Sequence, residues 1–448
     1  MNQIVANKTS KQSILSNSLL ISFAFATAYF PRILDAAGAP APVNFIHFIV
    51  VPAVLLIVLT TSKIRVRQHR NITHQLLTAL SILFTVVIIS AFINQAGYIN
   101  AIVEYLLLAE PFMLLLAIVA IPMSQPQIKQ FQRFIFTCAS INLLLAFIQK
   151  PLIDSGLLFA QGFDGTDGAQ GVFFVSGAGN YVSATVSLKF GLYFFLLSKK
   201  SPLWLRCAWL AAAGMQLIIS DSKQIMVAAF VAFSILIVRS LFKSNRKALI
   251  YLIIATVIGV GFVWALNNIE YFNAFENGIR KLSEWGPEGE ARKIKLAPFE
   301  IAVSHYTSGL NWLFGLGPGH SFGRLGGWFL RDYAALLQPL GATIHPASND
   351  AMYAYWNSWI AQESTFYHPF FGWAGIWGDL GLVGLSAYLY LGYIVWTKLA
   401  LKDLPKFYIL VVVVVGFIFT QMEEPGYMLF TAALIGLHWQ SYSARKAK

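Results

Sequence analysis

The stretch Leu217-Ile-Ile-Ser-Asp-Ser-Lys-Gln-Ile-Met226 joins two long apolar runs through a short polar corner. Apolar runs of about 18 residues are long enough to cross the hydrocarbon core of a bilayer as a helix. The same alternation recurs along most of the 448 residues, of which 57% are hydrophobic and only 12% are charged. A soluble protein has a charged fraction of about 25%. The sequence therefore predicts an all-α, polytopic membrane protein.

Twelve apolar segments are expected to form transmembrane helices. They cover residues 17–34, 45–62, 76–94, 101–122, 132–150, 180–198, 203–220, 224–241, 248–267, 368–396, 406–420 and 427–441. The even number places both termini on the same side of the membrane. We expect three regions: nine helices over 1–267, a large loop over 268–367, and three helices with a tail over 368–448.

The basic residues indicate which side is cytoplasmic. Lysines and arginines gather in the connections on one face, around residues 63–70, 199–206, 239–247 and 398–406, with Asp403 as the one acid among them. The positive-inside rule assigns this face and both termini to the cytoplasm. These connections account for most of the net charge of +12 through contact with membrane lipids, so no nucleic acid partner is expected.

Two connections stand out on the opposite side. The first, over 151–179, is rich in glycine and acids, as in Gln161-Gly-Phe-Asp-Gly-Thr-Asp-Gly-Ala-Gln-Gly171. The second, over 268–367, has about 100 residues, far above the usual length of a connection, so we expect it to be functional and partly folded. Cys138 and Cys207 fall in or beside predicted helices far apart in the chain, so they do not indicate a disulfide framework or a metal site.

Several cations of the non-cytoplasmic side are candidates for binding an anion. Lys223 lies in the corner between two helices, where it can pair with Asp221, reach lipid headgroups or meet other cations. Arg292 begins an amphipathic stretch that leads to the glycine-rich turn 314–324. Closely spaced glycines let backbone N–H groups approach an oxyanion that an arginine also holds, although such clusters also serve as plain turns. The further candidates in the loop are Arg280, Arg324 and Arg331.

His368 stands where the chain enters the membrane again after the large loop. An imidazole there can take a proton from an attacking hydroxyl at neutral pH. The aromatic residues before it, including Trp359 and Tyr367, suit either the membrane interface or stacking on sugar rings. Asp379, within the following span, is an ionisable group of the kind that faces a cavity rather than lipid, which a proton-coupled transporter would also use.

Three local patterns resemble those of the O-antigen ligase and bacterial polysaccharide polymerase superfamily. They are a small-polar and basic corner after a helix, here Ser222-Lys223; an arginine before an amphipathic stretch that ends in a Gly-x-Gly turn, here Arg292 before 314–319; and a histidine before Asp-x-Gly-Leu-Val-Gly, here His368 before 379–384. The large loop between the ninth and tenth helices also resembles this family. The sequence departs from it with a lysine in place of the usual arginine at 223, which cannot form a bidentate fork on phosphate, and with a proline after His368.

The resemblance implies an inverting glycosyltransferase of the bacterial inner membrane that uses no metal or other cofactor. Its donor would be a glycan on undecaprenyl diphosphate and its acceptor a glycan hydroxyl, at the periplasmic face. Lys223 and Arg292 would stabilise the departing diphosphate, and His368 would activate the acceptor. Arg280, Arg324, Arg331, Asp379, Tyr367 and Trp359 would contribute to substrate binding. Flippase and chain-length regulator proteins would be further partners.

Three functions remain open from the sequence. The first is a polymerase that joins lipid-linked repeat units into exopolysaccharide or O-antigen, favoured by the second outer segment 151–179, which can hold a growing chain. The second is a ligase that moves finished glycan to lipid A–core or to protein. The third is a flippase or transporter, which would have inverted repeats and broken helices in its two halves.

Overall fold

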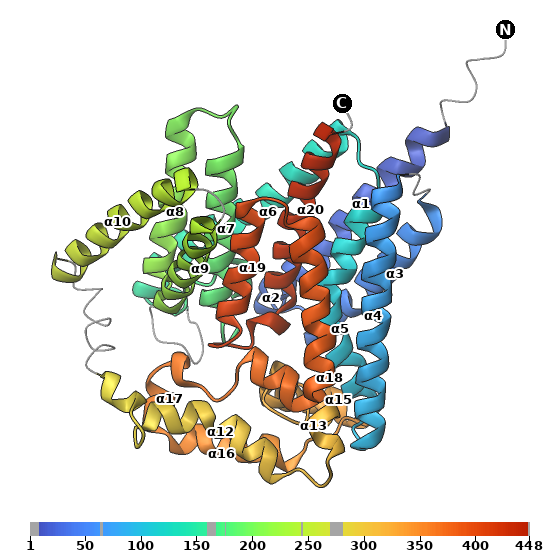
Figure 1. The fold of residues 1–448 in the computed structure, drawn as a ribbon, viewed down its shortest axis with the longest axis vertical. Helices are drawn as coiled ribbons and strands as arrows, with labels where there is room; N and C mark the ends of the chain where they lie inside the picture. Colours follow the sequence, from blue (N-terminus) through green and yellow to red (C-terminus); the bar gives the residue numbers. More distant parts are fainter. Residues whose placement is uncertain are drawn as a thin grey trace.

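The computed structural model describes residues 9–62, 66–158, 167–174, 176–242, 245–268 and 281–446. These residues form helices and turns, with no strand among them. The long helices stand side by side as a bundle, and the short helices of residues 281–367 form a layer across one end of it (Figure 1). The start of α1 and the end of α20 lie at the opposite end (Figure 1). The all-α prediction is therefore confirmed for the described residues.

Each of the twelve predicted segments coincides with a helix. The helices are α1 (Thr9–Tyr29), α3 (Ile46–Thr61), α4 (Arg67–Ile93), α5 (Tyr98–Ala120), α6 (Gln125–Asp154), α7 (Gly179–Leu197), α8 (Leu203–Ile219), α9 (Lys223–Leu241), α10 (Asn245–Asn268), α18 (Gly372–Ile394), α19 (Asp403–Val415) and α20 (Pro425–Lys446). Among the described residues, six helical stretches are long and apolar enough to cross a membrane: Ala41–Thr61, Arg67–Ile93, Tyr98–Ala120, Gln125–Asp154, Lys223–Leu241 and Thr365–Leu399. The count of twelve spans and the compartment of the termini stay predictions.

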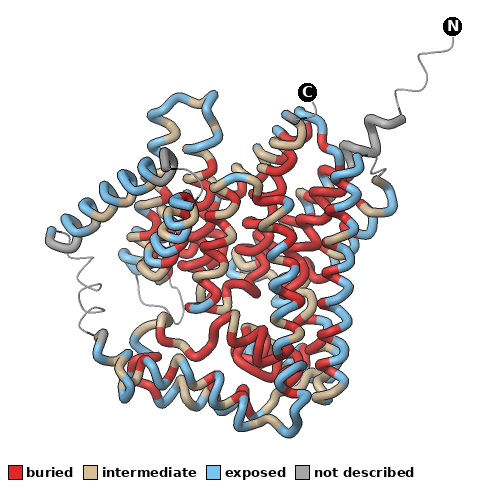
Figure 2. Tube along the Cα trace, viewed as in Figure 1, coloured by how far each residue is buried: buried red, intermediate tan, exposed pale blue. Residues whose placement is uncertain are grey.

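The burial pattern fits a bundle surrounded by lipid. In α4, Leu76, Leu80 and Leu83 are buried at helical spacing. Phe84 and Phe92 of the same helix are exposed, so α4 has apolar residues on both faces. A large exposed apolar surface is rare on a soluble monomer and indicates contact with a membrane or a partner. Figure 2 shows the buried residues inside the bundle and the exposed ones along its outer helices.

The layer at the end of the bundle has a core of its own. Its helices are α12 (Glu290–Ser304), α13 (Leu310–Phe314), α14 (Leu330–Asp332), α15 (Ala334–Leu337), α16 (Pro346–Asn357) and α17 (Trp359–Glu363). In α12, Ala291, Ile294, Pro298 and Ala302 are buried at intervals of three or four residues, which is the stripe of an amphipathic helix. This stripe faces α16, α17 and the start of α18, and it positions the rest of α12 over the rim of the bundle.

Candidate functional site

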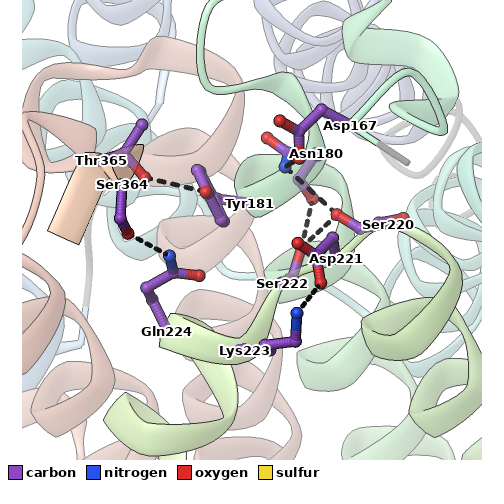
Figure 3. A network of polar contacts seen from close by, with 10 residues as sticks. All are labelled: Asp167, Asn180, Tyr181, Ser220, Asp221, Ser222, Lys223, Gln224, Ser364 and Thr365. Carbon is purple, nitrogen blue, oxygen red and sulfur yellow. Dashed lines mark hydrogen bonds and ion pairs between the residues drawn. The ribbon is translucent and has the colours of Figure 1, made fainter. Parts of the chain in front are cut away.

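The corner that carries Lys223 is built from three segments of the chain. Asp221, with φ of 46°, turns the chain in the left-handed region between α8 and α9. Asn180 of α7 donates a hydrogen bond from Nδ2 to the Ser220 carbonyl at 3.1 Å and to Asp167 Oδ1 at 2.9 Å. The Lys223 ammonium lies 2.6 Å from Asp221 Oδ1, so the structure shows the ion pair with Asp221 (Figure 3).

The same corner touches the segment that leads to His368. Gln224 donates from Nε2 to Ser364 Oγ at 3.4 Å. Thr365 donates from Oγ1 to the Tyr181 hydroxyl at 2.8 Å, and the Tyr181 ring stacks on Phe419 at 4.6 Å between centroids. Figure 3 shows that Ser364 and Thr365 face the first turn of α9 and the start of α7. His368 therefore follows, by three residues, a segment held against the Lys223 corner.

His368 lies in a half-buried position among aromatic rings. Its ring centroid is 4.6 Å from that of Tyr355 and 6.5 Å from that of Trp328. Helix α12 packs on the chain just before it, because Ala291 and Ile294 share a buried cluster with Ile360, Ala361 and Tyr367. This packing places the amphipathic helix α12, which also carries Arg292, against the residues just before His368.

The cation of α12 that contacts the chain just after His368 is Lys295. Its ammonium lies 4.9 Å from the centroid of the Phe371 ring and donates a hydrogen bond to the Ile418 carbonyl at 3.3 Å. Burial lowers the pKa of Lys295 from 10.5 to about 7, because an ammonium loses hydration there. An anion beside it would compensate that loss.

Arg292, the predicted cation, lies on the exposed face of α12. The sequence contained a signal for Lys295 instead. In a helix, residues 291, 295, 298 and 302 fall on one face, and that face is otherwise apolar and small. A lysine within an apolar stripe is the cation that the helix buries, whereas Arg292 falls beside the stripe.

The glycine-rich turn is occupied by a carboxylate of the protein itself. Gly315, Gly317 and Gly319 have φ of 70°, 108° and 68°, a region that favours glycine. The turn directs the N–H groups of His320 and Ser321 at Asp379 Oδ1, at 2.9 and 2.7 Å. The predicted oxyanion cradle is therefore formed, and Asp379 fills it. In this arrangement Asp379 holds the turn in place, and the N–H groups of His320 and Ser321 are already hydrogen-bonded to its carboxylate.

A break in helix α18 adds further contacts between α18 and the glycine-rich turn. Gly381 has φ of 66°, so the helical hydrogen bonding is interrupted there. The carbonyls of Gly378 and Asp379 accept instead from the N–H groups of Leu316 and Gly317, at 2.8 and 3.0 Å. A Cβ atom at position 381 would lie 2.4 Å from the backbone of Leu313, which is why only glycine fits.

Two predicted arginines are engaged in contacts within the protein. Arg324 forms an ion pair with Glu424, and its backbone N–H donates to Glu423 Oε2 at 2.6 Å. Arg331 donates to the carbonyls of Gly326 and Gly327, to Ser348 Oγ at 2.9 Å and to Asn349 Oδ1 at 2.7 Å. Arg324 therefore joins the outer layer to the chain before α20, Arg331 holds parts of the outer layer together, and neither is directed at His368 by these contacts.

The remaining predicted residues have different positions. Trp359 is 50% exposed, and the Lys281 ammonium lies 5.4 Å from its ring centroid. Tyr367 is buried, with its ring 6.0 Å from that of Trp285, so its aromatic face is used for packing. Arg280 and the glycine-rich part of the segment 151–179, from 159 to 166, lie outside the described residues.

Comparison with known proteins gives no independent assignment. No family model matches the chain, and no curated protein matches it. The functional interpretation therefore depends on the chemistry of the site. That site is the rim where the Lys223 corner, the Lys295 side of α12 and His368 meet the segment 360–371.

Proposed function

We propose that this protein transfers a glycan from a polyprenyl diphosphate carrier to a hydroxyl of an acceptor glycan, and that it acts as a polymerase of lipid-linked repeat units. The observation that carries the proposal is that Lys295 contacts Phe371 and Ile418, close to the segment that carries His368, and that this segment also contacts the Lys223 corner. An imidazole nitrogen and cations at one rim of a membrane bundle are the groups that such a transfer requires.

Each group has a defined part in the proposed reaction. The acceptor oxygen bonds to C1 of the donor sugar from the face opposite the diphosphate, which inverts the configuration. The C1–O bond to the diphosphate breaks, and its electron pair stays on the diphosphate. The acceptor proton passes to a ring nitrogen of His368. Lys295, and Lys223 when it exchanges Asp221 for the substrate, stabilise the charge that develops on the leaving group.

A contact of the segment 151–179 supports the polymerase over the ligase. Asp167 and Ala169, at the described end of this segment, bind the corner residues: Asn180 donates to Asp167, and Ser220 donates from Oγ to the Ala169 carbonyl at 2.7 Å. The described end of this segment therefore contacts the Lys223 corner. A second outer segment at the same rim provides a place for a growing chain next to the transfer site.

The test is glycan transfer by the purified protein in liposomes that contain a lipid-linked oligosaccharide. His368→Ala and Lys295→Ala are each expected to reduce transfer at least 100-fold, the range for removing a general base or a charge-stabilising group. The matched control is Lys293→Ala, because Lys293 lies on the same helix, is largely exposed and faces Glu288 at 3.5 Å. Full-length product from either of the first two variants would refute the proposed function.

A deletion strain separates the related functions. Loss of a polymerase leaves single repeat units on the carrier, whereas loss of a ligase leaves long polymer on it. If repeat units fail to reach the outer face of the membrane at all, the protein is a flippase or transporter.

A further inference from the structure

Helix α16 has an exposed aromatic face on the outer layer, at the end of the molecule opposite the start of α1 (Figure 1). Its buried side packs into the layer, where Ala347 and Ala351 share an apolar cluster with Ala302 of α12. On the other side of α16, Tyr353 and Trp356 are 71% and 58% exposed. Residues three apart on a helix are neighbours on its surface, so these two side chains form one aromatic patch.

The patch is bordered by side chains that can bond to hydroxyl groups. Asn349, Asp350 and Asn357 are exposed on the same side of α16. Asn357 donates from Nδ2 to the Tyr353 carbonyl at 2.8 Å, which leaves its Oδ1 as an acceptor. Asp350 Oδ2 lies 2.7 Å from His305 Nε2, which leaves Oδ1 as another. Aromatic faces bordered by amide and carboxylate groups suit a saccharide, because sugar C–H groups pack on the rings and sugar hydroxyls bond to the polar groups.

The charge of this face argues against lipid headgroups as its occupant. Asp350 is the one charged residue of α16, over Pro346–Asn357. Helices that lie on a membrane surface carry lysine and arginine on their polar face, and anionic headgroups repel a carboxylate. The occupant that fits α16 is therefore uncharged and rich in hydroxyl groups, as a chain of neutral sugars is.

Ring contacts connect the patch to the imidazole of the proposed reaction. The centroid of the Trp356 ring lies 4.8 Å from that of Tyr355, and the centroid of the Tyr355 ring lies 4.6 Å from that of His368. A single aromatic ring thus separates Trp356 from His368. A saccharide chain whose reacting hydroxyl lies at His368 can therefore extend along the surface over Trp356 and then Tyr353.

We propose that Tyr353 and Trp356 bind the acceptor glycan, at the sugars that follow the one whose hydroxyl reacts. This inference rests on the proposed function, because the acceptor is a substrate of that reaction. Stacking on the two rings holds the chain while its end is in place for transfer. Because the two rings lie along the helix, a longer chain is expected to bind more tightly than a single sugar.

The experiment measures the binding of uncharged oligosaccharides of increasing length to the purified full-length protein. Saturation-transfer NMR detects the binding, in a detergent without a sugar headgroup, which would compete for the patch. The wild type is expected to bind the longer probes. Trp356→Ala and Tyr353→Ala are each expected to weaken this binding about tenfold, near the upper end of the range for an aromatic stacking contact. Trp356→Phe, which keeps a ring, is expected to weaken it less.

The matched control is Tyr98→Ala, which is expected to leave oligosaccharide binding unchanged. Tyr98 is 90% exposed at the start of α5, next to Gly97, whose N–H donates to Thr343 Oγ1 of the outer layer at 3.0 Å. It is thus an exposed aromatic residue near the same layer but on another helix. Failure of the wild type to bind any probe, or equal binding by the wild type and Trp356→Ala, would overturn the inference. An equal loss of binding in Tyr98→Ala would overturn it too, since the effect would then not be specific to α16.

The two proposals fail in different ways. If oligosaccharides bind the wild type more tightly than Trp356→Ala but the wild type transfers no glycan, the saccharide site stands and the proposed function is wrong. If the wild type transfers glycan and Trp356→Ala does so with the same KM for the acceptor, the function stands and the saccharide site is wrong.

Discussion

The charge of Lys295 leads to a prediction about the pH dependence of transfer. With a pKa of about 7, Lys295 of the protein without substrate carries the ammonium form mainly below neutral pH. The guanidinium of arginine keeps its charge throughout the accessible range. We therefore predict that the transfer activity of the wild type declines at alkaline pH and that Lys295→Arg removes this decline.

The size of this effect follows from the pKa. The protonated fraction of Lys295 is about a tenth at pH 8 and about a hundredth at pH 9, so kcat/KM for the donor is expected to fall about tenfold per pH unit above 7. The value of kcat/KM reports the free enzyme, in which no diphosphate yet stabilises the ammonium. In Lys295→Arg the same parameter is expected to stay level between pH 7 and 9.

The assay is initial-rate transfer in liposomes between pH 6 and 9, with donor below saturation. Lys293→Arg on the same helix serves as the control, and its profile is expected to match the wild type. An alkaline decline of equal steepness and midpoint in Lys295→Arg would show that another group controls the profile and would refute the role assigned to Lys295.

Three further variants test other parts of the structure. Lys295→Met is expected to raise the melting temperature at pH 6, because burial lowers the pKa of Lys295 in the folded protein below the ordinary 10.5 and the charged lysine therefore destabilises the fold. This gain in melting temperature is complete below pH 7 and disappears as the pH rises toward 10.5. Thermal unfolding in detergent measures it. Asp379→Ala is expected to lower the free energy of unfolding by about 3 kcal/mol, because two N–H groups lose a charged acceptor, and Asp379→Asn, which keeps Oδ1, by less than half of that. Asp221→Asn keeps the left-handed turn but removes the ion pair, so pyrophosphate is expected to bind Lys223 more tightly; weaker binding in a titration would contradict this.

The positions of the long helices could be predicted because each depends on a local run of apolar residues. All twelve predicted segments coincide with helices, and their ends differ from the prediction by a few residues at most positions, with larger differences at α1 and at the starts of α4 and α6. The longest deviations arise where polar residues extend a helix beyond the apolar run, as in Arg67–Ile93, which begins nine residues before the predicted 76.

The partners of charged groups could not be predicted in the same way. Asp379 and the turn at 320–321 are about 60 residues apart, and only the tertiary fold shows that the carboxylate fills the turn. The contacts of Arg331 with Ser348 and Asn349 are likewise set by the packing of the outer layer. Lys295 is the exception, since the spacing of 291, 295, 298 and 302 already places it on the buried stripe of its helix.

The junction between the glycine-rich turn and the broken helix α18 also limits how the substrate can enter. Two backbone bonds and two carboxylate bonds join residues 316–321 to residues 378 and 379. Any motion that lifted this part of the outer layer would have to break all four or carry α18 with it. The outer layer is therefore fixed to the bundle on this side. In the proposed reaction, a lipid-linked donor is then expected to enter from the plane of the membrane, between helices, and not through the outer layer.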